Sequence, residues 1–185
     1  MKITDFHTHA FPDHMAERAL TILQGSTKDV TAQLDGKLSS LIASMDKAGI
    51  DRSVICSIAT KPSQFESILQ WSKDIKSDRI VPLPSVHPED PQSAQRVRQI
   101  AQSGFIGLKL HPYYQTFELD SEIAMPIYEA AAETGLLVLC HTGFDIAFPQ
   151  DRIADPRRVA KILKLFPDMK FVKSHFLAWA DWDET

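Results

Sequence analysis

The sequence has few cysteines and no long hydrophobic run. Cys56 and Cys140 are the two cysteines. Both lie in apolar runs and they lack C-x-x-C spacing, which indicates buried thiols in a reducing compartment and not a disulfide or a zinc pair. No apolar run approaches the roughly 18 residues that a membrane helix needs. The first nine residues hold charges and histidines where a signal peptide needs an apolar stretch. We therefore expect a cytoplasmic protein with no membrane contact.

A strong excess of one charge is also absent. The chain has 20 Lys and Arg against 24 Asp and Glu, a net charge of −4, and no block of five or more like charges. This balance argues against a nucleic-acid-binding arm or a polybasic membrane patch. Apolar residues make up 44% of the 185 residues, which is enough to bury the core of one domain. The class of function that the composition leaves open is chemistry on a small molecule.

Short apolar runs alternate with helix-like stretches along the chain. The runs predict strands at 3–10, 53–58, 80–86, 105–111, 136–142 and 170–176. Helical periodicity with start and stop signals predicts helices at 38–48, 63–76, 91–103, 121–134 and 156–166, and a short helix within 11–36. The alternation predicts βαβ units around a parallel sheet, hence an α/β fold.

Histidines gather at one position in this pattern. Six of the seven stand at the C-terminal ends of predicted strands, namely His7, His9, His87, His111, His141 and His175. In (β/α)8 barrels the C-terminal strand ends form the active-site face, whereas random scatter would put most histidines on solvent-facing helices.

Strand parity sharpens this grouping. His7 and His9 have i, i+2 spacing and share one face of their strand. The same alternation turns Lys109, His111, His141 and His175 toward one mouth, with Leu139 and Phe171 deeper in the lumen. Neutral imidazoles that converge in a cleft favour a divalent metal, for which zinc is the natural candidate.

Each of these residues also has a structural interpretation. An isolated H-x-H can be incidental, and His141 or His175 can be a satisfied core histidine. Lys109 can pair with an acid, while His87 and His111 precede prolines and can orient loops. Among the acids after the fifth strand, helix capping accounts for Asp155.

Four motifs in order carry a resemblance to a known family. They are Asp5-Phe-His-Thr-His-Ala-Phe-Pro, Gly107-Leu-Lys-Leu-His-Pro, Cys140-His-Thr-Gly and Lys173-Ser-His. Together they resemble the amidohydrolase superfamily, in particular the amidohydrolase-2 branch that includes relatives of amino-carboxymuconate-semialdehyde decarboxylase. The resemblance runs from residue 3 to about residue 176. TatD-like nucleases and PHP-type phosphoesterases also begin with H-x-H, but Lys109 and the scarcity of acidic ligands disfavour both.

The resemblance implies a distorted TIM barrel with a divalent metal at its C-terminal face. His7, His9 and His141 are the implied metal ligands, and His175 is the implied catalytic group beside a metal-activated water. We expect Lys109 and His111 to bind substrate, Lys109 through a carboxylate. The expected activity is hydrolysis of a small amide, ester or lactone, and the alternative is non-oxidative decarboxylation of an unsaturated or aromatic acid. In binuclear members a carboxylated lysine at the position of Lys109 bridges two metals, although the Lys-Leu-His-Pro setting is more like the mononuclear branch.

The chain departs from the family pattern at its end. The family takes a metal-binding aspartate from strand eight, whereas the predicted strands stop at the sixth, and a full barrel takes about 250 residues. Asp181 and Asp183 lie too near strand six to replace that aspartate. We therefore expect one partial barrel domain over residues 1–185, truncated after the sixth strand. A second alternative follows, an inactive truncated barrel whose open strand edges pair with a partner or a second copy.

Overall fold

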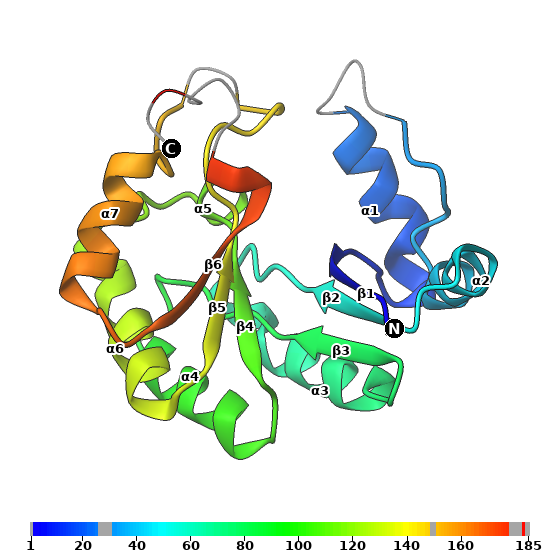
Figure 1. Cartoon of the computed structure of the whole chain (residues 1–185), viewed down its shortest axis with the longest axis horizontal. Coiled ribbons are helices and arrows are strands. Elements are labelled where there is room, and N and C mark those ends of the chain that lie inside the picture. Colours follow the sequence, from blue (N-terminus) through cyan, green and yellow to red (C-terminus); the bar gives the residue numbers. More distant parts are fainter. Residues whose placement is uncertain (1, 26–30, 149–150, 178–182, 184–185) are drawn as a thin grey trace.

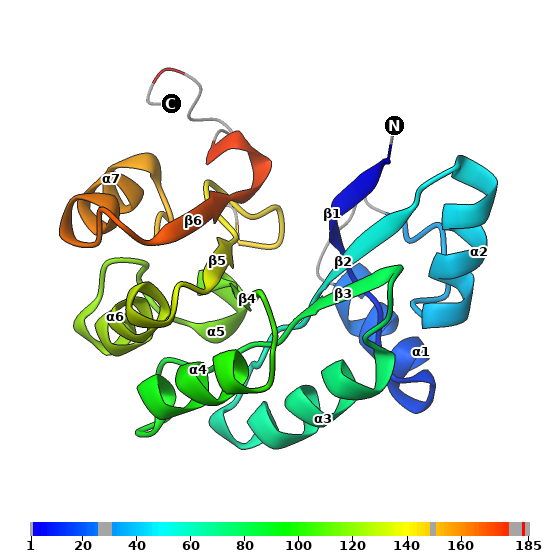
Figure 2. The same cartoon turned by 60° about the horizontal axis from the view of Figure 1, so that its bottom comes forward.

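The computed structural model of the chain describes residues 2–25, 31–148, 151–177 and 183. Its strands form two parallel three-stranded sheets, seen from two directions in Figures 1 and 2. The first sheet has the order β1 (Thr4–Thr8), β2 (Arg52–Cys56) and β3 (Ile80–Leu83), and the second has the order β4 (Gly107–Leu110), β5 (Leu137–Cys140) and β6 (Lys170–Lys173). All six predicted strands are therefore present, with shifted ends, and the predicted α/β class is confirmed.

Two prolines explain why the sheet divides between β3 and β4. Leu83 offers its carbonyl to Ser57 beside β2, while Pro84 offers its carbonyl to the Lys109 N–H at 2.8 Å. The even-numbered residues of this segment thus face β4, and Pro82 and Pro84 have no N–H to donate there. One isolated bridge, between Ser85 and Lys109, remains. The predicted parallel strands are therefore divided into two sheets at this junction.

Helices cover the outer sides of both sheets (Figure 1). The helices of the described residues are α1 (Asp13–Gly25), α2 (Leu38–Ala48), α3 (Phe65–Ile75), α4 (Ser93–Gln102), α5 (Pro112–Gln115), α6 (Met125–Thr134) and α7 (Pro156–Leu165), of which the short α5 lies at the strand ends. The side chain of Asp155 accepts the N–H groups of Arg157 and Arg158 at the start of α7, as its capping role predicts. The four-residue α5 was not predicted. Within the described ranges, no helix has the length and apolar character to cross a membrane.

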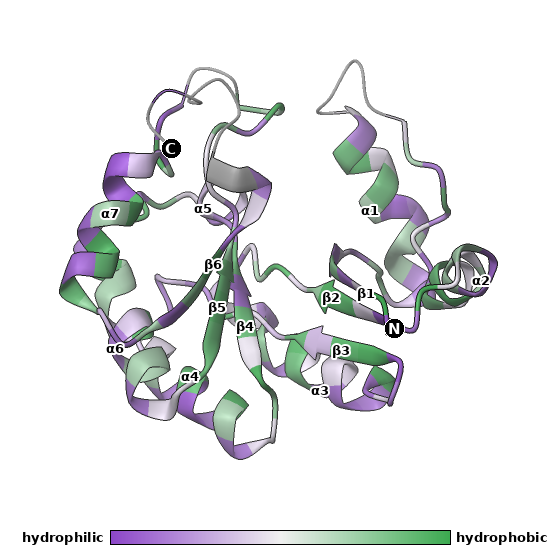
Figure 3. Cartoon of the chain, in the orientation of Figure 1, coloured by the Kyte–Doolittle hydropathy of each residue, from purple (hydrophilic) through white to green (hydrophobic). Residues whose placement is uncertain are grey.

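The second sheet carries the larger core. Leu108, Leu110, Val138 and Cys140 pack outward against the helices in one large apolar cluster, and Figure 3 shows β5 as hydrophobic along its length. The opposite faces of the two sheets enclose a smaller inner cluster that includes Leu139. Leu108 and Leu110 thus face the helices, on the side of β4 opposite to Lys109, as the alternation of a strand requires.

The predicted direction of Phe171 is wrong. Phe171 packs against the outer cluster, and Val172 packs against the inner one. The prediction assigned Phe171 to the lumen by counting alternate residues back from His175. However, β6 ends at Lys173, and a 3-10 turn (η3, Ser174–Leu177) follows it. Because the turn interrupts the alternation, the direction of His175 says nothing about the direction of Phe171.

The first sheet has thinner cover. Its outer cluster holds Ala10, Met45, Ile55 and Ile80 as buried members. On β1, Phe6 is 41% exposed. Among the described strands, β1 and β6 each pair with one neighbour. The two outer edges of the paired strands are therefore β1 and β6.

Candidate functional site

Five imidazoles lie in one continuous row at the C-terminal strand ends. Neighbouring ring centroids are 5.1 Å apart for His9 and His7, 5.3 Å for His7 and His175, 4.7 Å for His175 and His141, and 4.2 Å for His141 and His111. We call these five residues the histidine row. Both sheets contribute to it, so the structure brings together the histidines that strand parity placed around one mouth.

The pairing of β4 with β5 explains the position of two members. Leu110 pairs with Cys140, so His111 and His141 are the next residues on adjacent parallel strands. Their rings stack with an interplanar angle of 22°. The His111 N–H also donates to Gln115 Oε1 at 2.8 Å. Strand register together with this buried amide holds His111 against His141.

His175 reaches the row through a turn instead of a strand. Its φ is +58°, in the left-handed region that non-glycine residues rarely adopt. Two side chains hold the turn against β5, because the Ser174 hydroxyl donates to Cys140 O at 2.9 Å and the Thr142 hydroxyl donates to Ser174 O at 2.7 Å. Backbone strain of about 1–2 kcal/mol at an exposed histidine beside other histidines suggests a functional role.

The β1 pair meets β2 and β4. His9 Nδ1 lies 2.9 Å from Cys56 O, and since a carbonyl only accepts, Nδ1 carries the proton and Nε2 keeps a free lone pair. A backbone carbonyl that accepts the ring N–H of a metal-binding histidine orients that histidine in the same way. His7 Nε2 lies 3.2 Å from Lys109 Nζ. Lys109 thus joins the first sheet twice, through its backbone at Ser85 and through its side chain at His7.

Lys109 is fully buried. Burial lowers the pKa of its ammonium group, and burial raises the pKa of the neighbouring thiols, to about 11 for Cys56 and about 12 for Cys140. Both cysteines are free and buried, as their apolar setting predicts. The residue expected to hold a substrate carboxylate therefore lies inside the protein, against His7.

Burial and nearby positive charge favour the neutral form of the imidazoles. Burial, with Lys109 next, lowers the pKa of His7 to about 2. Burial, with His175 next, lowers the pKa of His141 to about 3. Burial, with His141 next, lowers the pKa of His111 well below its usual value. Neutral imidazole is the form that binds a metal ion, so the row suits a divalent cation.

Asp145 is one of the acids that follow the fifth strand, and the sequence alone assigned it no role. In the structure it is buried, and its Oδ2 lies 3.5 Å from the Nε2 atoms of both His111 and His141. Within the described ranges, these three residues form the one group of three metal-binding side chains whose ligand atoms all lie within 4.8 Å of one another. Burial raises the pKa of Asp145. The only feature of the sequence that could have pointed to Asp145 as part of the site is its position four residues after His141.

Aromatic rings border this end of the row. Tyr114 lies 4.6 Å from His111, Tyr113 lies 5.6 Å from His141, and Phe148 contacts both tyrosines, all between ring centroids. Tyr113 Oη also donates to Gly143 O at 2.7 Å. The tyrosines come from α5, so the helix missed in the sequence lines the site.

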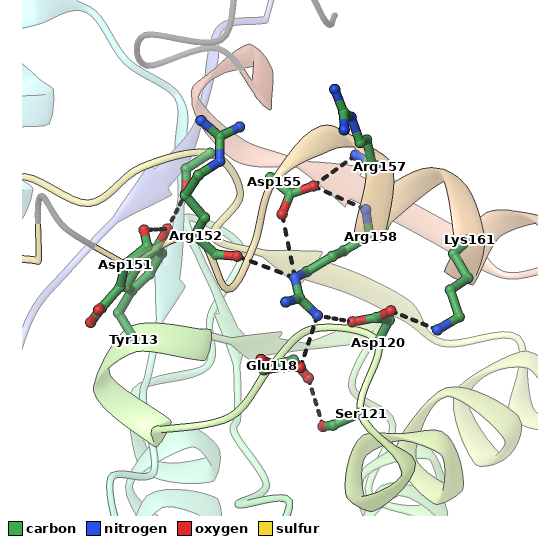
Figure 4. Close-up of polar contacts among 11 residues, drawn as sticks. Tyr113, Glu118, Asp120, Ser121, Asp151, Arg152, Asp155, Arg157, Arg158 and Lys161 are labelled. Atoms are coloured by element: carbon green, nitrogen blue, oxygen red, sulfur yellow. Dashed lines mark hydrogen bonds and ion pairs between the residues drawn. The ribbon is translucent and has the colours of Figure 1, made fainter.

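An ion-pair network fixes the loop between β5 and α7 (Figure 4). Arg158 contacts Glu118 at 2.9 Å, Asp155 at 3.3 Å and the Asp120 carboxylate, which also pairs with Lys161 at 2.7 Å. The Arg158 side chain donates to Arg152 O at 3.2 Å. The loop that carries Asp145 is thus tied at its far end to the segment before α6.

The other expected residues serve local structure or lie elsewhere. His87 Nδ1 accepts the Glu89 N–H at 3.1 Å, which fits the loop-orienting interpretation. His14 is exposed on α1. Asp183 is exposed, and Asp181 lies outside the described residues.

Comparison with known proteins identifies relatives by family and by fold. A family model described as amidohydrolase matches residues 4–182. No curated protein matches. An uncharacterized TIM-barrel protein from Bordetella bronchiseptica has a TM-score of 0.70 and 19% identity, over 97% of this chain and 68% of its own.

Two further solved structures have named activities. A 5-carboxyvanillate decarboxylase from Novosphingobium aromaticivorans with bound manganese has a TM-score of 0.64 and 17% identity, over 95% of this chain and 66% of its own. A probable 2-pyrone-4,6-dicarboxylic acid hydrolase from Acinetobacter baumannii has a TM-score of 0.57 and 14% identity, over 94% of this chain and 57% of its own. At these identities the likeness shows the fold alone, and the chain spans about three fifths to two thirds of these neighbours' lengths.

Proposed function

The chain belongs to the amidohydrolase family, and on that premise we propose that it is a metal-dependent hydrolase of a small amide, ester or lactone. The observation that carries the proposal is the histidine row, in which four strand ends from two sheets present imidazoles to one another. We further propose that the described strands form a single barrel-type domain.

His7, His9 and His141 are the proposed metal ligands. The Cys56 carbonyl leaves His9 Nε2 free, and burial keeps His7 and His141 neutral, so the donor chemistry fits a divalent metal such as zinc. A bound ion supplies Lewis acidity and lowers the pKa of a coordinated water. His7 and His9 come from the first sheet and His141 comes from the second, so the site would depend on both.

His175 is the proposed proton carrier. Its ring lies next to both His7 and His141, and its side chain is exposed, so a substrate can reach it. Burial of part of the ring and the charge of Lys109 lower its pKa, which favours the neutral imidazole that accepts a proton at neutral pH.

Lys109 and His111 are the proposed substrate contacts. Lys109 Nζ adjoins His7, where positive charge would attract an anionic substrate that the net charge of −4 repels. His111 stacks on His141 and meets Tyr114. We propose that His111 acts on a substrate carboxylate or carbonyl from the wall of the site, and that the buried Lys109 acts on it through its charge from behind His7.

Decarboxylation of a small unsaturated or aromatic acid is a second candidate. Tyr113, Tyr114 and Phe148 border His111 and His141, and aromatic rings suit a planar substrate. One structural neighbour is a decarboxylase with bound manganese. Release of carbon dioxide, measured on a panel of acids, would separate this activity from hydrolysis. A third candidate, an interaction role without catalysis, draws support from the exposed Phe6 on the β1 edge.

The test begins with chelator-stripped protein. Zn²⁺ or Mn²⁺ is added back, and turnover is measured on amides, esters, lactones and carboxylic acids. We expect activity to return with the metal, and we expect His141→Ala to bind at least about 100-fold less metal, since even a second-shell change costs about 10- to 100-fold. His14→Ala, on the exposed face of α1, is the matched control. Equal metal binding by wild type, His141→Ala and His14→Ala would remove the proposed site.

A further inference from the structure

The carboxylate of Asp145 is held as a preformed ligand. Its Oδ1 accepts the Ala147 N–H at 2.8 Å, so one oxygen is fixed by the backbone of its own loop. The other oxygen, Oδ2, lies 3.5 Å from His111 Nε2 and 3.5 Å from His141 Nε2. One carboxylate oxygen thus faces two imidazole nitrogens at equal distance.

The spacing matches shared coordination better than hydrogen bonding. An N–H···O bond has a donor–acceptor distance of about 2.7–3.2 Å. Two ligand atoms of a tetrahedral zinc site, each about 2.0–2.2 Å from the ion, stand about 3.3–3.6 Å apart. Both distances to Asp145 fall in the second range. His141 Nε2 also lies 3.3 Å from Phe144 O, so without an ion it carries a proton, which it would give up to bind one. A common ion between the three atoms fits this arrangement.

His111 is not satisfied as a core residue. Its Nδ1 is buried and has no hydrogen-bond partner among the described atoms, whereas buried polar groups in a settled core are paired. Its backbone is nevertheless fixed by Gln115. The backbone of His111 is therefore held in place by the chain, while Nε2, the nitrogen available to an ion, faces Asp145 Oδ2 at 3.5 Å.

An anion beside the row would offset the charge of a bound divalent ion. Neutral imidazoles add no negative charge to a divalent ion, and Lys109 is buried close by. Asp145 supplies a carboxylate within reach of His141, and its loop is secured by Gly143 N–H to Ala154 O at 2.8 Å and by Tyr113. Such anchoring keeps a ligand in position before the ion arrives.

We propose that Asp145 is the anionic ligand of the metal, bound beside His141, and that His111 completes the ligand set from β4 in place of the substrate contact proposed above. The proposal rests on the metal dependence of the proposed function and adds a carboxylate that comes from the loop after β5. The metal site would then draw its neutral donors from both sheets and its negative charge from the second sheet alone.

The test is titration of the chelator-stripped full chain with Co²⁺, followed by calorimetry and by visible absorption. Asp145→Asn keeps an oxygen for the Ala147 N–H and removes the charge. We expect it to weaken Co²⁺ binding by at least about 100-fold, beyond the 10- to 100-fold of a second-shell change. Asp151→Asn makes the same chemical change at an exposed position of the same loop, and we expect it to stay within about twofold of wild type. His111→Gln is the second variant, with an expected loss of about 10- to 100-fold.

The outcomes separate this inference from the proposed function. If Asp145→Asn and His111→Gln bind Co²⁺ as wild type does, while His9→Gln and His141→Ala lose it, the inference is overturned and the proposed function stands. If the wild-type chain binds no Co²⁺, the proposed function fails and the inference fails with it. Loss of binding in Asp145→Asn, with Asp151→Asn unchanged, supports the inference whatever substrate the enzyme uses.

Discussion

The two sheets differ in how well they are packed and in what they give to the site. The second sheet backs onto a large apolar cluster that spans several helices, whereas the outer cluster of the first sheet has Ala10, Met45, Ile55 and Ile80 as its buried members. The first sheet contributes His7 and His9 from an edge strand with exposed apolar residues. The second contributes His111, His141, Asp145 and His175. The well-packed region therefore carries most of the site, and the weakly covered strand completes it.

The junction between the sheets determines how the histidines of the first sheet lie relative to those of the second. One isolated bridge joins Ser85 to Lys109, and the Lys109 side chain reaches His7. Gln115 also crosses the junction, since its amide donates to Ala59 O at 3.0 Å and to Val86 O at 2.9 Å. A few polar contacts thus set the distance between the two groups of histidines.

The largest expected effect is at His175. If it carries a proton and does not bind the metal, His175→Asn should keep most of the metal and lose about 10²- to 10⁴-fold in turnover, the usual contribution of general acid–base catalysis. Metal content and turnover are measured on the same preparation. Loss of metal in proportion to loss of activity would make His175 a ligand instead.

The packing contrast can be measured directly by cavity-forming substitutions. Leu110→Ala opens the large cluster and should lower the free energy of unfolding by about 3–5 kcal/mol, while Met45→Ala in the small cluster should cost about 2–3 kcal/mol because thin cover can collapse around the gap. Urea denaturation of both variants gives the comparison. Equal costs would show that the two sheets are packed equally well.

Gln115 tests the junction. Gln115→Leu keeps the side-chain volume and leaves the His111 N–H and two carbonyls without their partner. Each buried group left unpaired costs about 1–3 kcal/mol, so for the three groups we expect a loss of at least about 3 kcal/mol. Gln102→Leu, on an exposed position of α4, should cost under about 0.5 kcal/mol. Similar values for the two variants would contradict a role for Gln115 across the junction.

The smallest expected effect is in the network of Figure 4. Arg158→Ala breaks several partly buried ion pairs and should cost about 1 kcal/mol, whereas Arg98→Ala breaks one exposed pair with Glu133 and should cost about 0.3 kcal/mol. Thermal unfolding of both variants at low and high salt measures the two losses of stability. A larger cost for Arg98→Ala would show that the network adds nothing to the second sheet.

Strand positions and the gathering of histidines could be predicted because both follow from local pattern. Apolar runs mark buried parallel strands, and parallel strands put their C-terminal ends on one side. The position of Asp145 could not be predicted, because it depends on how Tyr113 and Ala154 hold a loop. The same holds for Phe171 and His175, whose directions differ because a left-handed turn follows β6.

The central claim is that the two sheets hold one divalent metal between them. Anomalous diffraction at the absorption edge of Zn²⁺ or Mn²⁺, from crystals of the full chain grown with that ion, tests it directly. The account predicts a single peak at the histidine row, within about 2.0–2.3 Å of the His7, His9, His141 and Asp145 ligand atoms. A peak with all its ligands elsewhere, or no peak at the row in ordered density, would contradict it.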